Sequence, residues 1–119
     1  MTKYRIIMHK GRIIANLAKY CDTAFTRAMG LMFTLPLKKE QACILVANNE
    51  SIMETSIHMF FVFYPIDVLW LNEKKEVVDK RISVWPFTPL LIPKLAAKYV
   101  IELPRKRAEN LVIGTKLDF

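Results

Sequence analysis

The segment SIHMFFVFYPIDVLWLN, residues 56–72, places the strongest constraint on the fold of this chain. Across the fifteen residues of 57–71, only His58 and Asp67 are ionisable near neutral pH. The segment is shorter than the roughly 20 apolar residues that cross a bilayer, and Pro65 interrupts it. We therefore expect it to form the inside of a fold, with no transmembrane segment.

β-Branched and aromatic residues dominate this segment and favour strands, while the Tyr64-Pro65 pair predicts a break. The sequence therefore predicts two buried strands over about 56–62 and 66–72. If they pair as an antiparallel hairpin, His58 lies diagonal to Asp67 on one face. A register slip of one residue would put the two side chains on opposite faces.

A hairpin is predicted at the N-terminus, because TKYRIIMH and RIIANLAK flank Lys10-Gly11, whose glycine can take the positive φ that a two-residue turn requires. Pairing His9 with Arg12 puts alternate residues on two faces. The predicted core face holds Tyr4, Ile6, Met8, Ile13, Ala15 and Leu17. The predicted outer face is largely basic and holds Lys3, Arg5, Ile7, His9, Arg12, Ile14 and Asn16.

Short elements separated by turn signals are predicted along the rest of the chain. Asp22 can cap a short helix that Gly30 ends. Apolar runs predict strands in ACILVA, VVDKRISVW and KYVIEL, and the prolines of PFTPLLIPKLAA predict a covering loop between the last two. Gly114 marks a turn or bulge between short terminal strands.

The length of 119 residues, with 53% hydrophobic and 24% charged residues, predicts one globular domain, 1–119. The short strands predict a mainly β fold, a compact antiparallel β-sandwich or barrel-like domain with one short helix near residues 22–29. A longer helix in residues 87–98 would make the fold α+β instead.

His58 and Asp67 are the candidate pair for an enzymatic function, since a carboxylate can orient an imidazole as a general base. The alternative is that Asp67 accepts backbone hydrogen bonds and His58 is a core or rim histidine. Glu102 could complete a metal site with them, but ligands scattered over three segments are a weak signal, and we predict no metal and no cofactor. We expect Glu102 to be a solvated or backbone-paired carboxylate at a strand end.

Cys21 and Cys43 lack the CxxC spacing of zinc sites, and two cysteines make no disulfide framework, so both are interpreted as reduced thiols. No Gly-rich phosphate loop and no serine elbow flanked by glycines occurs in the sequence. The start, MTKYRIIMHKGRII, has no apolar stretch of signal-peptide length, which predicts a cytoplasmic protein.

Two candidate surfaces follow from these residues. Trp85 and Phe87, in and beside the proline-broken loop, could roof an apolar pocket whose polar groups are His58, Asp67 or Glu102, unless the loop merely covers the core. With a net charge of +7, the N-terminal hairpin could also bind nucleic acid or another polyanion. The residues of that candidate face are Lys3, Arg5, His9 and Arg12, and the alternative is a solvated strand face.

Several stretches together resemble one family: TRAMGLMF, SIHMFFVFYPIDVLWLNEKKEVVD, WPFTP, YVIELP and the terminal IGTKLDF. They resemble the uncharacterised bacterial and archaeal family called domain of unknown function 192. The resemblance implies a mainly β domain of sandwich type, with no established activity, substrate or cofactor. The positions of this chain that match the family motifs have no known role. They are Arg27, Gly30, Leu31, Met32, His58, Pro65, Ile66, Asp67, Glu102, Leu103 and Pro104. Where the family tends to follow ELP with a small residue and glycine, this chain has Arg105-Lys106.

The sequence thus predicts a binding or interaction module with an apolar pocket near Trp85, His58 and Asp67, for a small apolar ligand or a protein partner. A nucleic-acid or polyanion binder and an enzyme using His58 and Asp67 stay open as alternatives. The oligomeric state is left open.

Overall fold

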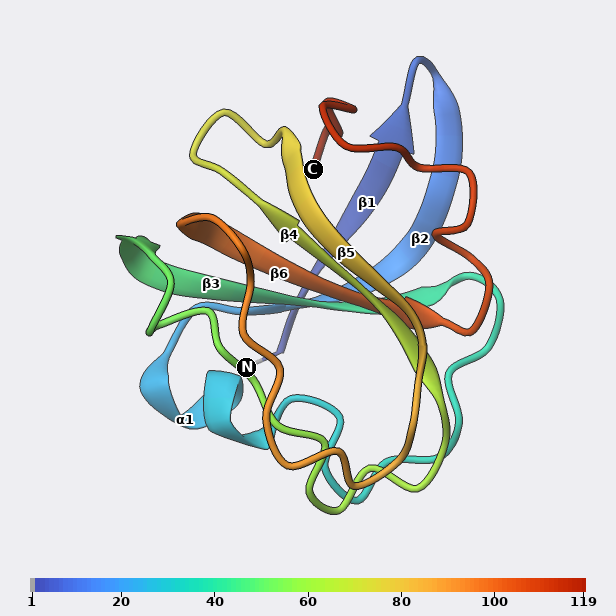
Figure 1. Cartoon of the computed structure of the whole chain (residues 1–119). Helices are drawn as coiled ribbons and strands as arrows, with labels where there is room; N and C mark the ends of the chain where they lie inside the picture. The colour runs from blue at the N-terminus through green and yellow to red at the C-terminus, as the bar shows by residue number, and fades with distance from the viewer. Residues whose placement is uncertain (1) are drawn as a thin grey trace.

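The strands of this protein form one six-stranded sheet in the order β1-β2-β3-β6-β4-β5 (Figure 1). The structure is a computed structural model that describes residues 2–119. The strands are β1 (Lys3–His9), β2 (Arg12–Cys21), β3 (Gln41–Ser51), β4 (Ile66–Leu71), β5 (Val77–Val84) and β6 (Ala97–Pro104). β2 and β3 pair in parallel, whereas the other neighbours are antiparallel.

The mainly β class with one short helix is confirmed. Within residues 2–119 the only α-helix is α1 (Ala24–Met29), and residues 87–98 form no helix. Thr23 caps α1 by accepting a hydrogen bond from the Thr26 amide at 3.1 Å, in place of the predicted Asp22. No helix among the described residues is long and apolar enough to span a membrane.

The sheet curls around an inner apolar core, which makes the fold barrel-like. Ile7 of β1 and Leu71 of β4 belong to one buried cluster, although three strands lie between theirs in the sheet. The C-terminal segment helps to close the curl, because Met8 of β1 pairs with Asp118 and Glu76, beside β5, pairs with Lys116.

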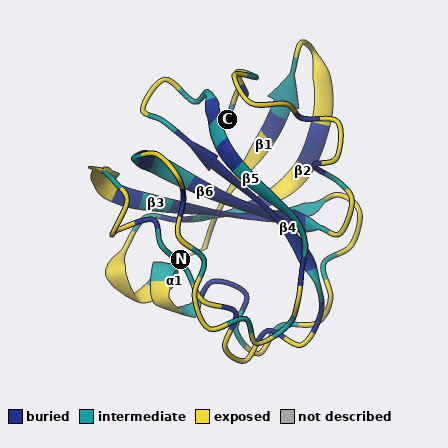
Figure 2. Cartoon of the chain, in the orientation of Figure 1, coloured by how far each residue is buried: buried dark blue, intermediate teal, exposed yellow. Residues whose placement is uncertain are grey.

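The outer face of the sheet carries a second apolar core. α1 and the loops 30–40, 52–65 and 85–96 contribute to it or lie over it (Figure 1). Every residue of β4 is buried, whereas much of these covering loops is exposed (Figure 2). The sheet is thus covered on both faces, and the outer layer is made of loops and one short helix.

The predicted strand 56–62 is wrong, whereas the strand predicted at 66–72 is confirmed as β4. Residues 52–65 form an irregular loop that has a single bridge, Ile57 to Leu91. The physical reason is that β5 and β6 pair with the two edges of β4, so that no edge remains for residues 56–62. The strand that forms a hairpin with β4 is β5, and not the segment 56–62 as predicted.

The N-terminal hairpin forms with its turn at Lys10 and Gly11, both with positive φ. The predicted pair His9 and Arg12 is confirmed, but the register shifts on both sides of Ile7. Such bulges change which side chains face the core, and the predicted core face is largely wrong. Buried residues include Ile7 and Ile14, whereas exposed ones include Tyr4, Ile6, Ile13 and Leu17.

Candidate functional site

A pocket of about 210 Å³ lies between the outer face of the sheet and its covering segments. β3 and β6 supply its floor, the end of α1 supplies one wall, and the loop 52–65 supplies another. Its lining residues include Arg27, Gly30, Leu31, Met32, Leu45, Thr55, His58, Val62, Val100 and Glu102. The pocket lining is therefore mixed: apolar side chains alternate with polar and ionisable ones, which also include Glu54 and Ser56.

Glu102 is the buried ionisable group of this pocket. It lies opposite Val68 and Cys43 in the sheet, so it faces the outer core as the alternation in YVIELP predicts. The expectation of a solvated or backbone-paired carboxylate is wrong, because Glu102 is only 4% exposed. Its Oε1 is the one buried side-chain oxygen or nitrogen without a hydrogen-bond partner in residues 2–119.

Burial is the main reason that the pKa of Glu102 is raised to about 8, because the charged carboxylate loses its hydration inside the protein. The nearby Cys21 raises this pKa further, and a hydrogen bond from the Cys43 thiol to the carboxyl group lowers it in part. Glu102 is therefore mostly protonated and neutral at pH 7. A neutral carboxyl group can both donate and accept a hydrogen bond, and the structure leaves Oε1 free to do so.

Gly30 brings the backbone at the end of α1 close to Glu102. It has a φ of 41°, which L side chains rarely adopt, and it ends the helix as predicted. A Cβ atom at this position would lie 3.6 Å from Oε1 of Glu102 and 3.8 Å from Cδ2 of Leu45. The absence of a side chain keeps this side of the pocket open beside the carboxyl group.

Two basic side chains lie in the pocket walls. Arg27 of α1 donates from Nη1 to the Val46 carbonyl at 2.8 Å, which holds the half-buried guanidinium against β3. His58 is exposed, and its Nδ1 accepts a hydrogen bond from the Phe60 amide at 3.1 Å. Arg27 retains further N–H donors, since a guanidinium carries five.

Cys21 and Cys43 are both free, as predicted, and lie behind Glu102 on the same face of the sheet. Their sulfur atoms are 3.5 Å apart. The hydrogen bond with Cys21 and burial together raise the pKa of the Cys43 thiol. Both thiols belong to the buried outer core and neither lines the pocket.

Asp67 lies on the opposite face of the sheet from Glu102. It pairs with Leu103, whose side chain belongs to the inner core. Its Oδ1 accepts from the Ser83 amide at 2.8 Å and its Oδ2 from the Ala108 amide at 2.9 Å. The structure therefore does not bring Asp67 to His58, and the geometric basis of the proposed pair is absent.

Trp85 and Phe87 do not roof this pocket. Trp85 is 79% exposed, and Phe87 packs edge-on against Phe61 and Phe63 at the end of the molecule. Of the five predicted pocket residues, the structure brings together His58 and Glu102 and separates the other three from them. The described residues contain no group of three metal-ligating side chains.

The predicted polyanion face is partly engaged within the protein. Lys3 pairs with Asp22 at 2.8 Å, and the guanidinium of Arg5 lies 4.2 Å from the centre of the Tyr20 ring. His9 and Arg12 face each other near the turn. Polyanion binding through this hairpin stays a prediction.

Sequence reasoning from spacing missed Arg27, Gly30 and Leu31 as pocket residues. The family resemblance could have indicated them, because its GLM, histidine and ELP motifs come from three separate segments of the chain. Gly30, His58 and Glu102, one from each motif, line the same pocket. The unassigned motif residues therefore meet in space.

The fold and the pocket define a small mainly β domain in which one curled sheet carries a ligand-sized hollow on its outer face. The chain belongs to the family of domain of unknown function 192, described as uncharacterized ACR, whose family model matches residues 6–119. The resemblance seen in the sequence is thereby confirmed.

Archaeal relatives agree with this membership, and a solved structure shares the fold. A UPF0127 protein of Thermococcus sibiricus is 38% identical over 113 residues, which cover 92% of this chain and 70% of the relative. A UPF0127 protein of Pyrococcus furiosus is 35% identical over 113 residues, which cover 92% of this chain and 92% of the relative. A crystal structure of a Novosphingobium aromaticivorans protein of unknown function has a TM-score of 0.85 at 18% identity, covering 99% of this chain and 85% of that one. This last likeness shows the fold alone.

Proposed function

We propose that this domain binds a small neutral molecule with an apolar body and a hydroxyl group, and that the hydroxyl group pairs with Glu102. The observation that carries the proposal is the unpaired Oε1 of Glu102 beside the pocket. A buried polar atom without a partner costs about 1–3 kcal/mol. A ligand that supplies the missing hydrogen bond removes this cost.

The charge state of the buried part of the pocket supports a neutral ligand at Glu102, whereas the second carboxyl group of the lining, Glu54, is exposed. Because the pKa of Glu102 is raised to about 8, the carboxyl group is mostly uncharged at neutral pH. A cationic amine would require Glu102 to ionise in a buried site, which opposes the effect of burial. A hydroxyl group can donate and accept, and it therefore complements a protonated carboxyl group.

The apolar part of the lining supports the apolar body of the proposed ligand. Leu31, Leu45, Val62 and Val100 contribute hydrocarbon surface around the carboxyl group. A volume of about 210 Å³ suits a compact ligand such as a substituted six-membered ring. Arg27 in the wall can donate to a lone pair on the same hydroxyl group or on a second substituent.

The test is an NMR titration of the protein with cyclohexanol, with cyclohexylamine as the cationic counterpart of the same size. We expect cyclohexanol to shift the amide signals of Gly30 and Val62, and the amine to bind more weakly at neutral pH. Glu102→Leu should weaken cyclohexanol binding by about tenfold, the loss of one hydrogen bond. The matched control Glu109→Leu, at an exposed site outside the pocket, should leave it unchanged.

Two results would reject the proposal. One is the absence of shifts at Gly30 and Val62 with either probe. The other is equal cyclohexanol affinity in the protein and in Glu102→Leu, which would show that the carboxyl group takes no part in binding.

We also propose a cytoplasmic location. The two free thiols support it, because cysteines whose sulfur atoms lie 3.5 Å apart stay unbonded most readily in a reducing compartment. Fractionation of cells into cytoplasmic, membrane and external fractions tests this location, and exclusive recovery outside the cell would contradict it.

A further inference from the structure

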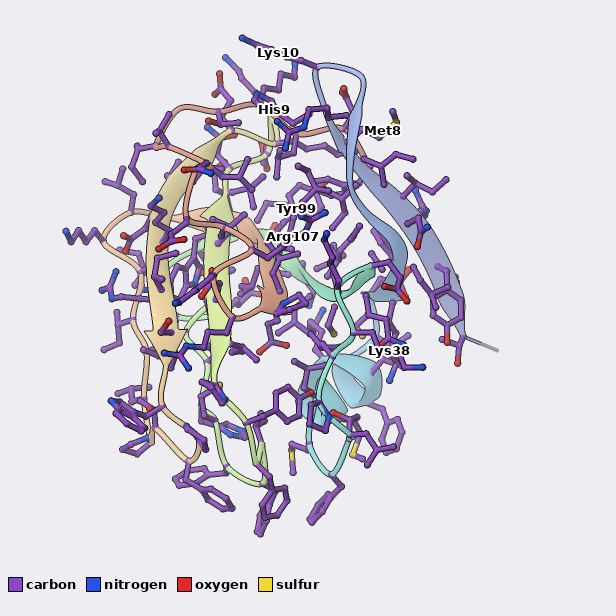
Figure 3. The ribbon with its side chains drawn as sticks, turned by 90° about the vertical axis from the view of Figure 1, so that its right-hand side faces the viewer. Met8, His9, Lys10, Lys38, Tyr99 and Arg107 are labelled. Atoms are coloured by element: carbon purple, nitrogen blue, oxygen red, sulfur yellow. The ribbon has the colours of Figure 1, made fainter. Side chains whose placement is uncertain are left out.

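Four phenylalanine rings from three loops form an exposed aromatic cluster, here called the aromatic tip: Phe33, Phe61, Phe63 and Phe87. Phe33 stacks on Phe61 with ring centres 4.7 Å apart, and Phe63 meets Phe87 edge-on at 5.1 Å. The Phe61 and Phe87 ring centres are 6.0 Å apart, which joins the two pairs. Each residue is 42–64% exposed. In Figure 3 ring side chains project at the end of the molecule opposite Lys10.

The backbone beneath these rings is strained. Phe33, Phe61 and Phe87 have φ angles of 59°, 61° and 61°, a left-handed conformation that is unfavourable for bulky residues and suits glycine or asparagine. Backbone hydrogen bonds hold the loops together, from the Phe33 amide to the Phe61 carbonyl at 2.8 Å and from the Phe87 amide to the Met59 carbonyl at 3.0 Å. Strain of this kind concentrates at functional sites, and the fold alone gives no reason for phenylalanine at these positions.

The stretches of these loops that carry the four rings, residues 31–37, 59–66 and 85–93, contain no Asp, Glu, Lys, Arg or His, although His58 directly precedes the second stretch. Lys38 and Lys39 follow the first of these segments and Lys94 follows the third, and all three lysines are exposed. The net charge of the chain is +7. An uncharged aromatic surface on a chain with a net positive charge matches the interface of an anionic bilayer, where aromatic rings insert among the headgroups and acidic lipids attract the basic protein.

A second copy of the chain is a poorer match for this surface. It would have to present a complementary surface of about 800 Å², and it carries the same net charge of +7, which opposes close approach. Insertion into lipid needs no complementary surface, and an anionic bilayer attracts a chain of this charge.

We propose that the aromatic tip docks this protein on the surface of anionic lipid bilayers, with Phe33, Phe61, Phe63 and Phe87 inserted at the headgroup level. This function goes beyond the ligand proposed for the pocket and does not depend on it. The protein attaches through loops that enter one leaflet.

The test measures binding to vesicles of phosphatidylglycerol and phosphatidylcholine in equal parts. We expect the protein to sediment with these vesicles, and more weakly with phosphatidylcholine alone or at high salt. The variant Phe33→Asn/Phe61→Asn/Phe87→Asn should lose affinity on the order of a hundredfold. Its melting temperature should not fall, because asparagine tolerates positive φ. The control Ile13→Asn, which removes an exposed apolar side chain near the other end, should bind as the unmodified protein does.

Trp85 gives a second measurement on the unmodified protein. It is 79% exposed and lies in the third loop, whereas Trp70 is fully buried, so an aqueous quencher reaches mainly Trp85. Anionic vesicles should protect Trp85 from quenching and shift its emission to shorter wavelength. This readout stands even where the triple variant fails to fold.

Three outcomes would overturn the proposal: no protection of Trp85 by anionic vesicles, equal vesicle binding by a folded triple variant, or equal binding to neutral and anionic vesicles. Sedimentation in the ultracentrifuge, without lipid, tests the alternative that a second copy of the chain covers the aromatic tip. A dimer that forms without lipid, and that the triple variant abolishes, would assign the aromatic tip to a second copy of the chain.

Discussion

Asp67 and Glu102 are two buried carboxyl groups on adjacent strands, and they lie on opposite faces of the same sheet. Asp67 faces the inner core, where each of its oxygens accepts a backbone hydrogen bond. Glu102 faces the outer core, where Oε1 has no partner and a pocket lies beside it. Burial alone therefore does not separate the structural role of Asp67 from the ligand-binding role that we propose for Glu102. The two groups differ in how completely their oxygens are hydrogen-bonded.

Removal of Asp67 should have the largest effect on stability. Asp67→Ala leaves the part-buried Ser83 amide and the buried Ala108 amide without acceptors, and we expect a loss of about 3 kcal/mol in the free energy of unfolding. Chemical denaturation measures this loss. A cost below about 1 kcal/mol would show that Asp67 does not hold these two segments.

The second-largest expected effect is a pH dependence of the free energy of unfolding that arises from Glu102. Its pKa is about 8 in the folded protein, above the ordinary value of 4.5, so the folded state keeps the proton that the unfolded state releases between these values. Stability is therefore fully present below about pH 4.5 and falls as pH rises toward 8. From about pH 5 to about pH 7 the expected fall is roughly 3 kcal/mol.

Denaturation curves of the protein and of Glu102→Gln, measured at several pH values, test this dependence. The glutamine variant cannot ionise and should lose most of the slope. An equally steep fall in both proteins would assign the effect to other groups.

Replacement of Glu102 by leucine should stabilise the protein at neutral pH by about 1–2 kcal/mol, because it removes an unpaired buried polar group. The comparison with Asp67→Ala is the sharpest available, since the two changes remove buried carboxyl groups with opposite expected signs. Thermal denaturation measures both. A clear loss of stability in Glu102→Leu would mean that Glu102 has structural partners like those of Asp67.

Gly30→Ala should have the smallest effect, a loss of about 1 kcal/mol, because an L side chain is strained at a φ of 41°. The added methyl group also lies against Glu102 Oε1 and should weaken cyclohexanol binding. Gly114→Ala, which has a φ of 92° and open space around it, provides the control with backbone strain alone. If both variants bind cyclohexanol equally, Gly30 does not shape the pocket.

Much of the fold could be predicted from local patterns. Alternation in YVIELP placed Glu102 on the correct face, and the apolar runs located β3 to β6, because both signals depend only on neighbouring residues. The segment 56–62 failed because its composition suits a strand, while the availability of a strand edge depends on where β5 and β6 pair. The hairpin faces failed because the bulges beside Ile7 leave no signal in the sequence.

The site could be predicted only in part. Glu102 and His58 were candidates, but the missing hydrogen bond of Glu102 is a property of three segments that meet in space. The approach of Gly30 within 3.6 Å of the carboxyl group depends on how α1 packs on β3 and β6. Spacing along the chain contains no such information.

The position of β6 in the sheet has a consequence for how the protein folds. β3 and β4 are consecutive along the chain, yet β6 lies between them, so the two groups of strands β1-β2-β3 and β4-β5 remain unconnected until β6 is inserted. Non-local pairings of this kind are slow to form. The strand that completes the sheet is also the strand that carries Glu102, so the floor of the pocket is complete only when β6 lies in place.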